Sequence, residues 1–248
     1  MCTISWFVDA QAYHIFFNRD EDVNRPKAAP PALLNQANVQ CVMPVDPKGN
    51  GTWLVANEFG CAFALLNFYQ GRLPKGRLHS RGEVVRDIAS SENLQAAEAY
   101  LNQLDLNRYA PFSLLAFSPE IVSQARSKKS GFSVPLFCWT GKALEKTYRA
   151  SPLFSSAVYF DRISASRMQV YNAFIEGNPE VCIDEFYALH KSHLPEKSRS
   201  SICMHREDAK TVSFSHVSVS SEAVSFEYVD GAPCETRPLP TIRLRRKL

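Results

Sequence analysis

Short runs of alternating apolar and polar residues fill the first part of the chain and indicate β-strands. Four runs are predicted to form two hairpins of sequence neighbours, over 2–8 with 13–18 and over 52–56 with 61–67. Between the hairpins, the prolines within 25–31 predict an irregular, extended loop.

Apolar residues recur at helical spacing later in the chain, and predict helices at 80–88, 92–104, 161–174 and 179–190. Ser80 stands three residues ahead of Glu83, the spacing of a capping box, so we expect its hydroxyl to cap the first helix. Further strands are predicted at 112–117, 132–139, 200–205, 211–219 and 223–229, with the polar stretch 123–130 as a connection.

Groups of strands separated by pairs of helices do not follow the strict alternation of a parallel βαβ fold. The order instead favours an α+β protein, built as a four-layer αββα sandwich of two antiparallel sheets. We expect one domain over residues 1–236, followed by a basic, solvated C-terminal tail at 237–248.

The composition is that of a globular protein, because 45% of the 248 residues are hydrophobic and 21% are charged. A chain of this length buries enough surface to fold without a disulfide or a metal. The net charge of +3 is too small to indicate a nucleic-acid partner.

The sequence contains no apolar run of the roughly 20 residues that a bilayer span requires. Its first residues also lack the basic and apolar regions of a signal peptide. We therefore expect a cytoplasmic protein without stable membrane insertion, while nothing in the sequence indicates an oligomeric state.

Seven cysteines are widely spaced, and none forms a Cys-x-x-Cys pair. An odd number at such spacing argues against a disulfide framework and against a zinc site, so no metal is expected. Most of these cysteines are expected to be buried as small hydrophobic residues, with Cys2 as the exception by position.

Removal of Met1 would leave Cys2 as the first residue, with a thiol and a free α-amine on the same residue. The α-amine has a reference pKa of about 7.7–8.0, so it could act as the general base for the thiol. The alternative is that Cys2 is a buried strand residue behind a retained Met1.

A charged stretch follows the second predicted strand, where Arg19 stands among the carboxylates of Asp20, Glu21 and Asp22. The first hairpin would bring this turn close to Cys2. There Arg19 could lower the pKa of the thiol, and a carboxylate could orient the α-amine. A solvated surface turn is the alternative.

Five short motifs follow one another in a characteristic order along the first part of the sequence. They are Met1-Cys2-Thr3-Ile4, Asn18-Arg19-Asp20-Glu21 with Arg25-Pro26 after it, Gly51-Thr52-Trp53, Ala64-Leu65-Leu66-Asn67 and Ser80-Arg81-Gly82-Glu83. In this order the chain resembles the transport and Golgi organisation protein 2 family, which is also named for its Asn-Arg-Asp-Glu motif. The resemblance is specific over about residues 1–90.

The resemblance implies the fold of the N-terminal-nucleophile hydrolases and a similarity to choloylglycine hydrolases, which cleave amides through an acyl-enzyme. It implies a catalytic group of Cys2, Arg19 and either Asp20 or Asp22. Asn67 could donate to the oxyanion, with a satisfied turn amide as the alternative. Trp53 and Arg81, which belong to the matching motifs, are expected to bind the ligand.

The second half departs from the family pattern. Ser156 stands where an Asn donor is expected, and a late Gly-Thr-Arg step is absent, so that Arg206 or Lys210 would have to supply the cation. We expect Ser156 and Arg206 to bind the ligand. The loss of one oxyanion donor typically costs a few kcal/mol of transition-state stabilisation, which disfavours efficient hydrolysis.

The family is also implicated in heme movement and in lipid or acyl-CoA homeostasis, which implies a second kind of function. The cleft would then bind an apolar or anionic small molecule without turnover. Heme, as a non-covalent cargo, would be ligated by one of the following residues: Cys2, His14, His79, His190, His193, His205 or His216. No Cys-x-x-Cys-His attachment motif is present.

Overall fold

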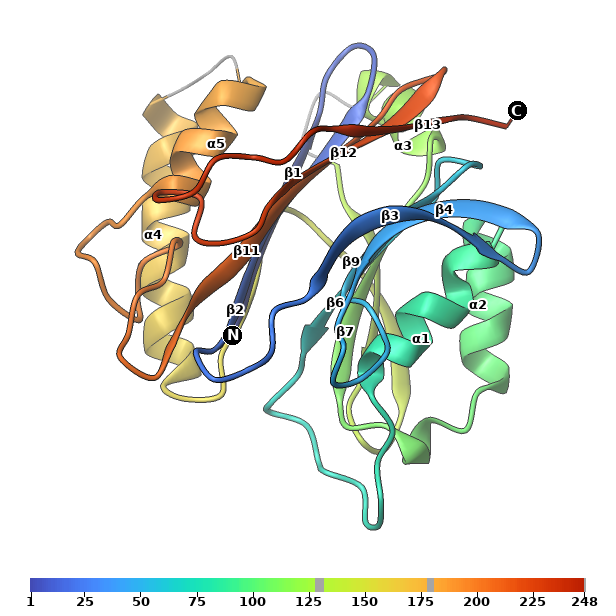
Figure 1. The fold of residues 1–248 in the computed structure, drawn as a ribbon, viewed down its shortest axis with the longest axis horizontal. Coiled ribbons are helices and arrows are strands. Elements are labelled where there is room, and N and C mark those ends of the chain that lie inside the picture. The colour runs from blue at the N-terminus through green and yellow to red at the C-terminus, as the bar shows by residue number, and fades with distance from the viewer. Residues whose placement is uncertain (128–131, 178–180, 248) are drawn as a thin grey trace.

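Two antiparallel sheets lie face to face in the computed structural model, which describes residues 1–127, 132–177 and 181–247 (Figure 1). The first sheet has the strand order β10 (Leu153–Ser155), β1 (Cys2–Val8), β2 (Tyr13–Asp22), β11 (Ala209–Val219), β12 (Ala223–Val229) and β13 (Ile242–Arg245). The second has the order β3 (Ala29–Gln36), β4 (Val39–Val45), β5 (Leu54–Asn57), β6 (Ala62–Asn67), β7 (Phe112–Phe117), β8 (Val134–Trp139) and β9 (Leu144–Arg149).

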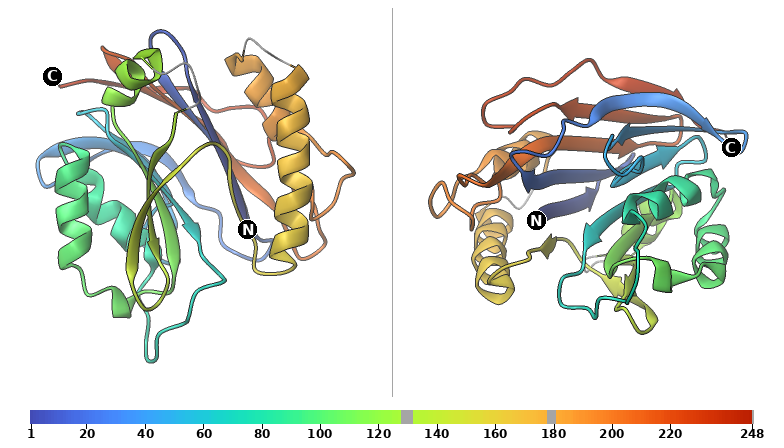
Figure 2. Two further views of the ribbon diagram at one scale, coloured as in Figure 1. Left: turned by 180° about the vertical axis from the view of Figure 1, so that it is seen from behind. Right: turned by 60° about the horizontal axis from the view of Figure 1, so that its bottom comes forward.

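Helices cover the outer faces of both sheets (Figure 2). The helices α1 (Arg81–Asp87) and α2 (Leu94–Gln103) pack on the second sheet, together with the short 3₁₀ turns η1 (Ile88–Ser90) and η2 (Leu106–Arg108). The helices α4 (Phe160–Gly177) and α5 (Ile183–Lys191) pack on the first, and α3 (Glu120–Ser127) contacts the layer between the sheets. The predicted α+β class and αββα layers are confirmed.

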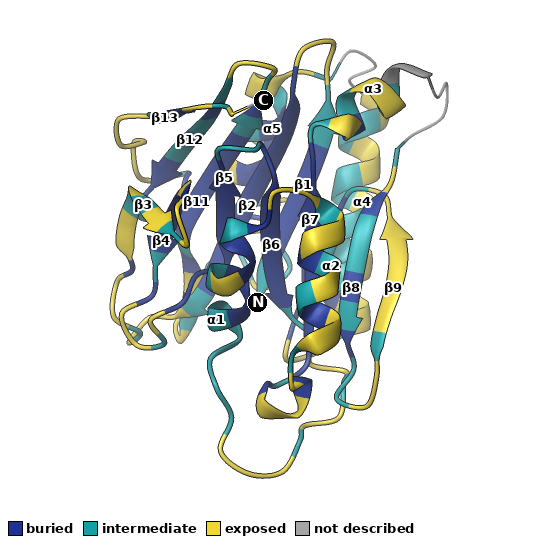
Figure 3. Cartoon of the chain, turned by 90° about the vertical axis from the view of Figure 1, so that its right-hand side faces the viewer, coloured by how far each residue is buried: buried dark blue, intermediate teal, exposed yellow. Residues whose placement is uncertain are grey.

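Three apolar clusters separate these four layers, because strands covered on both faces bury every side chain (Figure 3). In β6, Ala62, Ala64 and Leu66 contact the layer between the sheets, while Phe63 and Leu65 contact the layer under α1 and α2. This explains why the inner strands are near-continuous apolar runs in the sequence.

The polar residues at 18–22 were expected to form a turn, but they continue β2 as far as Asp22. The register pairs Asp20 with Thr211 and Asp22 with Ala209 of β11, with a bulge between Thr211 and Ser213. These residues are therefore fixed in a central strand, where neighbouring side chains point to opposite faces.

Other expectations need correction. The predicted loop at 25–31 runs into β3, which pairs with β4, and the predicted strand at 200–205 is irregular, with one isolated bridge at His205. Ser80 precedes α1 but makes no side-chain cap, whereas Asn93 caps α2 through Ala96 N–H.

The end of the chain was expected to be a solvated tail, yet residues 242–245 form β13 and pair with β12. The predicted connection at 123–130 is helical as far as Ser127, and its last residues lie outside the described part, as does the start of the helix predicted at 179–190. In the described ranges, no helix combines the length and apolar character needed to cross a bilayer.

Candidate functional site

A cavity of about 490 Å³ opens between the two sheets at the start of β1. The first sheet contributes Cys2, Arg19 and Glu21, and the other side contributes residues of the second sheet, α1 and their loops. The candidates from the sequence that line the cavity are Cys2, Arg19, Asp20, Trp53, Asn67, His79 and Arg81.

The β1–β2 register places Cys2 and Arg19 next to each other on the cavity wall. The two residues are direct cross-strand partners, so their side chains share a face of the sheet. The guanidinium of Arg19 lies 4.3 Å from the centroid of the Trp53 ring, and its Nη2 lies 3.3 Å from Glu21 Oε2. Arg19 therefore connects the two sheets across the cavity.

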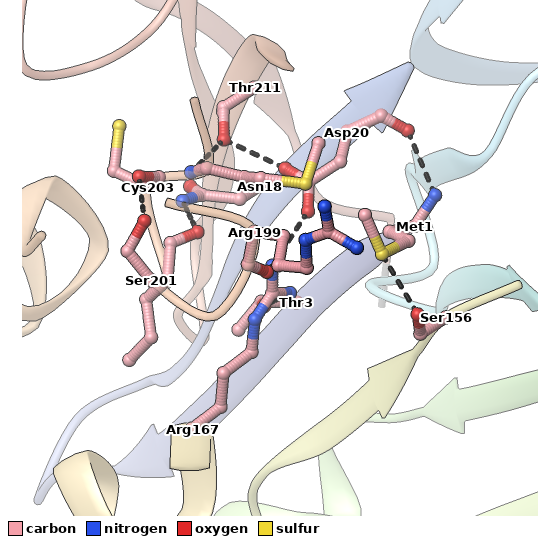
Figure 4. A network of polar contacts seen from close by, with 12 residues as sticks. Met1, Thr3, Asn18, Asp20, Ser156, Arg167, Arg199, Ser201, Cys203 and Thr211 are labelled. Atoms are coloured by element: carbon pink, nitrogen blue, oxygen red, sulfur yellow. Dashed lines mark hydrogen bonds and ion pairs between the residues drawn. The ribbon is translucent and has the colours of Figure 1, made fainter. Parts of the chain in front are cut away.

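Asp20 turns to the opposite face of β2, toward the helices (Figure 4). Its Oδ1 accepts a hydrogen bond of 2.7 Å from Thr211 Oγ1, and its Oδ2 lies 3.2 Å from Arg167 Nη2. Arg167 is fully buried and also donates to Thr3 Oγ1 at 2.6 Å. Burial raises the pKa of the Asp20 carboxyl, against the opposing charge of Arg167.

Met1 is hydrogen-bonded to the backbone of Asp20 rather than to its carboxylate. Its α-amine donates to the Asp20 carbonyl at 3.2 Å, and the Asp20 N–H donates to the Met1 carbonyl at 3.0 Å (Figure 4). Burial raises the pKa of the Cys2 thiol, and the Met1 amine and Arg19 oppose this only in part. With Met1 in place, the thiol is therefore protonated at neutral pH and the α-amine belongs to another residue.

Ion pairs neutralise much of the charge around the cavity. Arg25 lies 2.5 Å from Asp46 Oδ2 and 3.5 Å from Glu21 Oε2. Arg81 instead donates to the Pro111 carbonyl at 3.1 Å, and no carboxylate of the described residues lies within ion-pair distance of it. The Arg81 guanidinium is thus available to an anionic ligand.

Comparison with known proteins identifies the family and the fold. The sequence model of the family described as Transport and Golgi organisation 2 matches residues 1–152. The chain belongs to this family. A search of curated proteins found no significant match to this chain.

Solved structures share its fold at low sequence identity. A mutant of conjugated bile acid hydrolase from Clostridium perfringens is 9% identical, with a TM-score of 0.59 over 100% of this chain and 97% of that chain. A Caenorhabditis elegans orthologue of N-acylethanolamine-hydrolyzing acid amidase is 10% identical, with a TM-score of 0.55 over 97% and 100%. The family member therefore has an N-terminal-nucleophile hydrolase-like fold.

Three of the residues that the sequence predicted for the site do not line the cavity. Asp22 is exposed at the end of β2 and accepts the Asn24 N–H at 2.7 Å. Arg206 forms an ion pair of 2.5 Å with Asp208. Ser156 is buried beside Met1, and its hydroxyl lies 2.9 Å from Met1 Sδ and donates to the Val158 carbonyl at 2.5 Å.

Sequence reasoning missed Arg167 and Thr211, which hold Asp20 from the helix side of the sheet. A signal for Arg167 was present, because it lies at helical spacing from Ile163 and Val170 on the apolar face of α4. An arginine on such a face needs a buried partner. Thr211 carries no comparable signal, because threonine is common in strands.

Proposed function

We propose that the protein hydrolyses small, non-peptide acyl amides with the Cys2 thiol as the nucleophile, after removal of Met1. One observation carries the proposal: Cys2 lies at the start of a central strand, directly opposite Arg19, on the wall of a cavity between the sheets. The shared fold supports it, because the names of the similar structures describe hydrolysis of conjugated bile acids and of N-acylethanolamines.

Removal of Met1 would convert the backbone nitrogen of Cys2 into an α-amine next to its own thiol. The amine would take the proton from Sγ, and Arg19 would favour the thiolate. Sγ would then attack the amide carbonyl carbon, and the C–N bond would break as the leaving amine takes the proton back from the α-amine. Water would cleave the resulting thioester to release the acid.

The cavity lining indicates the kind of substrate. Trp53, Leu65 and Leu78 provide apolar surface for an acyl chain, and Arg81 provides a cation without a carboxylate partner in the described residues. An acyl amide with a carboxylate on either side of the amide bond would use both features.

A second candidate is binding without turnover, with an apolar anion such as heme or a fatty acyl compound as cargo. Two hydrogen bonds favour it. The Ser156 hydroxyl donates to the Val158 carbonyl, and the Asn67 amide donates to Tyr69 Oη at 2.8 Å. The Ser156 hydroxyl is therefore engaged elsewhere and Asn67 keeps only one free N–H, and a missing oxyanion donor costs a few kcal/mol in the transition state.

The test compares chains prepared with and without Met1. We expect an N-acylglycine to release amine in a burst only from the chain without Met1, and intact mass to show a Cys2 thioester. Cys2→Ala should abolish both signals, whereas Cys182→Ser, which alters an exposed cysteine, should change neither. Binding without amine release would establish the second candidate instead.

A further inference from the structure

A group of metal-ligating side chains lies outside the cavity, where the loop after α5 meets the turn after β12. His193, Cys203 and His205 come from the loop, and Cys234 comes from the turn. One ligand atom from each residue lies within 4.8 Å of all the others. None of the four residues lines the cavity that contains Cys2.

The distances fit a tetrahedral ion. The two Sγ atoms of Cys203 and Cys234 are 3.5 Å apart, and His205 Nε2 lies 3.6 Å from the first and 3.2 Å from the second. Zinc bonds of about 2.3 Å to sulfur and about 2.0–2.1 Å to nitrogen give tetrahedral edges of roughly 3.3–3.8 Å. The two sulfur atoms are far beyond the roughly 2.05 Å of a disulfide.

One buried polar atom in the same group is without a hydrogen-bond partner among the described residues and favours a cation as its partner. His193 Nε2 is buried without a hydrogen-bond partner in the described part of the chain, and the His193 ring lies 5.0 Å from the ring of His205. Two thiols in close contact beside an unpaired imidazole nitrogen satisfy one another poorly by hydrogen bonds. The same atoms are suitable ligands for a metal ion.

An acidic residue also lies close to one of the four ligand side chains. Glu235 Oε1 lies 3.8 Å from His205 Nδ1, on the opposite side of the ring from Nε2, and 3.1 Å from Lys197 Nζ. At 3.8 Å the carboxylate is beyond hydrogen-bond distance of Nδ1, so it contributes a negative charge beside the imidazole rather than fixing its tautomer.

We propose that His193, Cys203, His205 and Cys234 bind one zinc ion in a closed tetrahedral site. Two thiolates and two imidazoles suit zinc, and four protein ligands leave no open position, so the ion would be structural. The sequence hid this site because its ligands lack the Cys-x-x-Cys spacing. The one local signal is Cys203-Met204-His205, in which two ligands are separated by a single residue.

The ion would stabilise the irregular loop that supports Asp20. Cys203 N–H donates to the Ser192 carbonyl, and Met204 N–H donates at 2.8 Å to Thr211 Oγ1, which itself donates to Asp20 (Figure 4). Arg167 also donates to the Arg199 carbonyl of this loop at 3.3 Å. The site is separate from the cavity and does not depend on the proposed hydrolysis.

The first test measures the metal content of the purified full chain by mass spectrometry. We expect about one zinc per chain in the unmodified protein, and a loss of most of it in Cys203→Ser and in Cys234→Ser. Cys138→Ser is the matched control, because Cys138 lies in β8, in the other sheet, and it should retain the zinc. Equal zinc content in all variants would overturn the proposal.

A second measurement keeps the test valid if a serine substitution unfolds the loop. The unmodified protein is treated with a chelator and then titrated with Co²⁺. We expect a thiolate-to-cobalt charge-transfer band and intense d–d bands of a tetrahedral ion, both removed by added Zn²⁺. A folded protein that takes up neither metal, or one in which peptide mapping finds a Cys203–Cys234 disulfide, would contradict the proposal.

Discussion

Alternation along one strand decides what each residue of the Asn-Arg-Asp-Glu motif can do. Arg19 and Glu21 face the cavity between the sheets, whereas Asn18 and Asp20 face the helices. Asn18 donates from its amide to the carbonyls of His190 and Ile202, both at 2.9 Å. The side chains of Asn18 and Asp20 are therefore engaged in structural contacts, whereas those of Arg19 and Glu21 face a ligand in the cavity.

His190, which also contacts Asn18, makes folding stability sensitive to acid. Its ring is fully buried between Ser5 Oγ at 2.7 Å and Asn18 Oδ1 at 3.0 Å. Burial, reinforced by His216 and Arg167, lowers its pKa from 6.5 to about 3. Below about pH 6.5 the imidazole of His190 is therefore protonated in the unfolded chain. In the folded protein it stays neutral down to about pH 3.

We predict that this imidazole removes stability as the pH falls, by up to about 1.4 kcal/mol per pH unit. The free energy of unfolding, measured in urea between pH 7 and pH 5, should show a shallower slope for His190→Gln. Asn102→Gln, an uncharged substitution at an exposed position of α2, is the control, and its slope should match that of the unmodified protein. An unchanged slope for His190→Gln would mean that His190 accepts its proton in the folded state.

At the scale of elements, burial explains part of which strands could be predicted, although the largely buried β4 was missed. β1 and β7 contribute residues to the clusters between the layers, so their runs at 2–8 and 112–117 are clear in the sequence. β9 is almost entirely exposed (Figure 3), and β3 contains Pro30 and Pro31, so neither has a recognisable strand pattern.

Long-range partners limit prediction of the site in the same way. Cys2, Arg19 and Asn67 could be selected from short motifs near the start of the chain. The partners of Arg167 and the grouping of the proposed zinc ligands could not, because they depend on which distant segments the fold brings together. Sequence spacing contains no information on such pairs.

β13 gives a direct test at this scale, because the sequence indicated a solvated tail there. Leu244 is 3% exposed and packs into the cluster between the sheets, whereas neighbouring Arg243 is exposed. Leu244→Ala should lower the free energy of unfolding by about 2–4 kcal/mol through the lost contacts and the cavity left behind. Arg243→Ala should change it by less than about 0.5 kcal/mol. If both variants lose similar amounts of unfolding free energy in urea titrations, the segment is not packed as a strand.

At the scale of the whole molecule, the cavity lies between two halves that are held together mainly by apolar contacts, with a few hydrogen bonds such as that of Tyr13 Oη to the Gly60 carbonyl. Cys2 and Arg19 belong to the first sheet, and Trp53 and Asn67 line the cavity from the side of the second. Arg81, at the start of α1, completes the wall. A ligand that fills this space contacts both sheets, and it binds only when they are in place.

Such a ligand should therefore stabilise the molecule as a unit. We predict that an N-acylglycine, added to Cys2→Ala so that no turnover occurs, raises the free energy of unfolding by about 2.7 kcal/mol at one hundred times its Kd. For a chain of this size the melting temperature should rise by roughly 5–10 °C, as measured by scanning calorimetry.

The position of the anion can be tested in the same assay. Arg81→Ala, in the Cys2→Ala background, should weaken binding about tenfold or more, because a charge-assisted hydrogen bond contributes about 1.5–3 kcal/mol. Arg206→Ala removes an arginine that pairs with Asp208 away from the cavity, so its Kd should be unchanged. Equal losses in both variants would indicate a general effect of net charge, and would contradict binding of the carboxylate at Arg81.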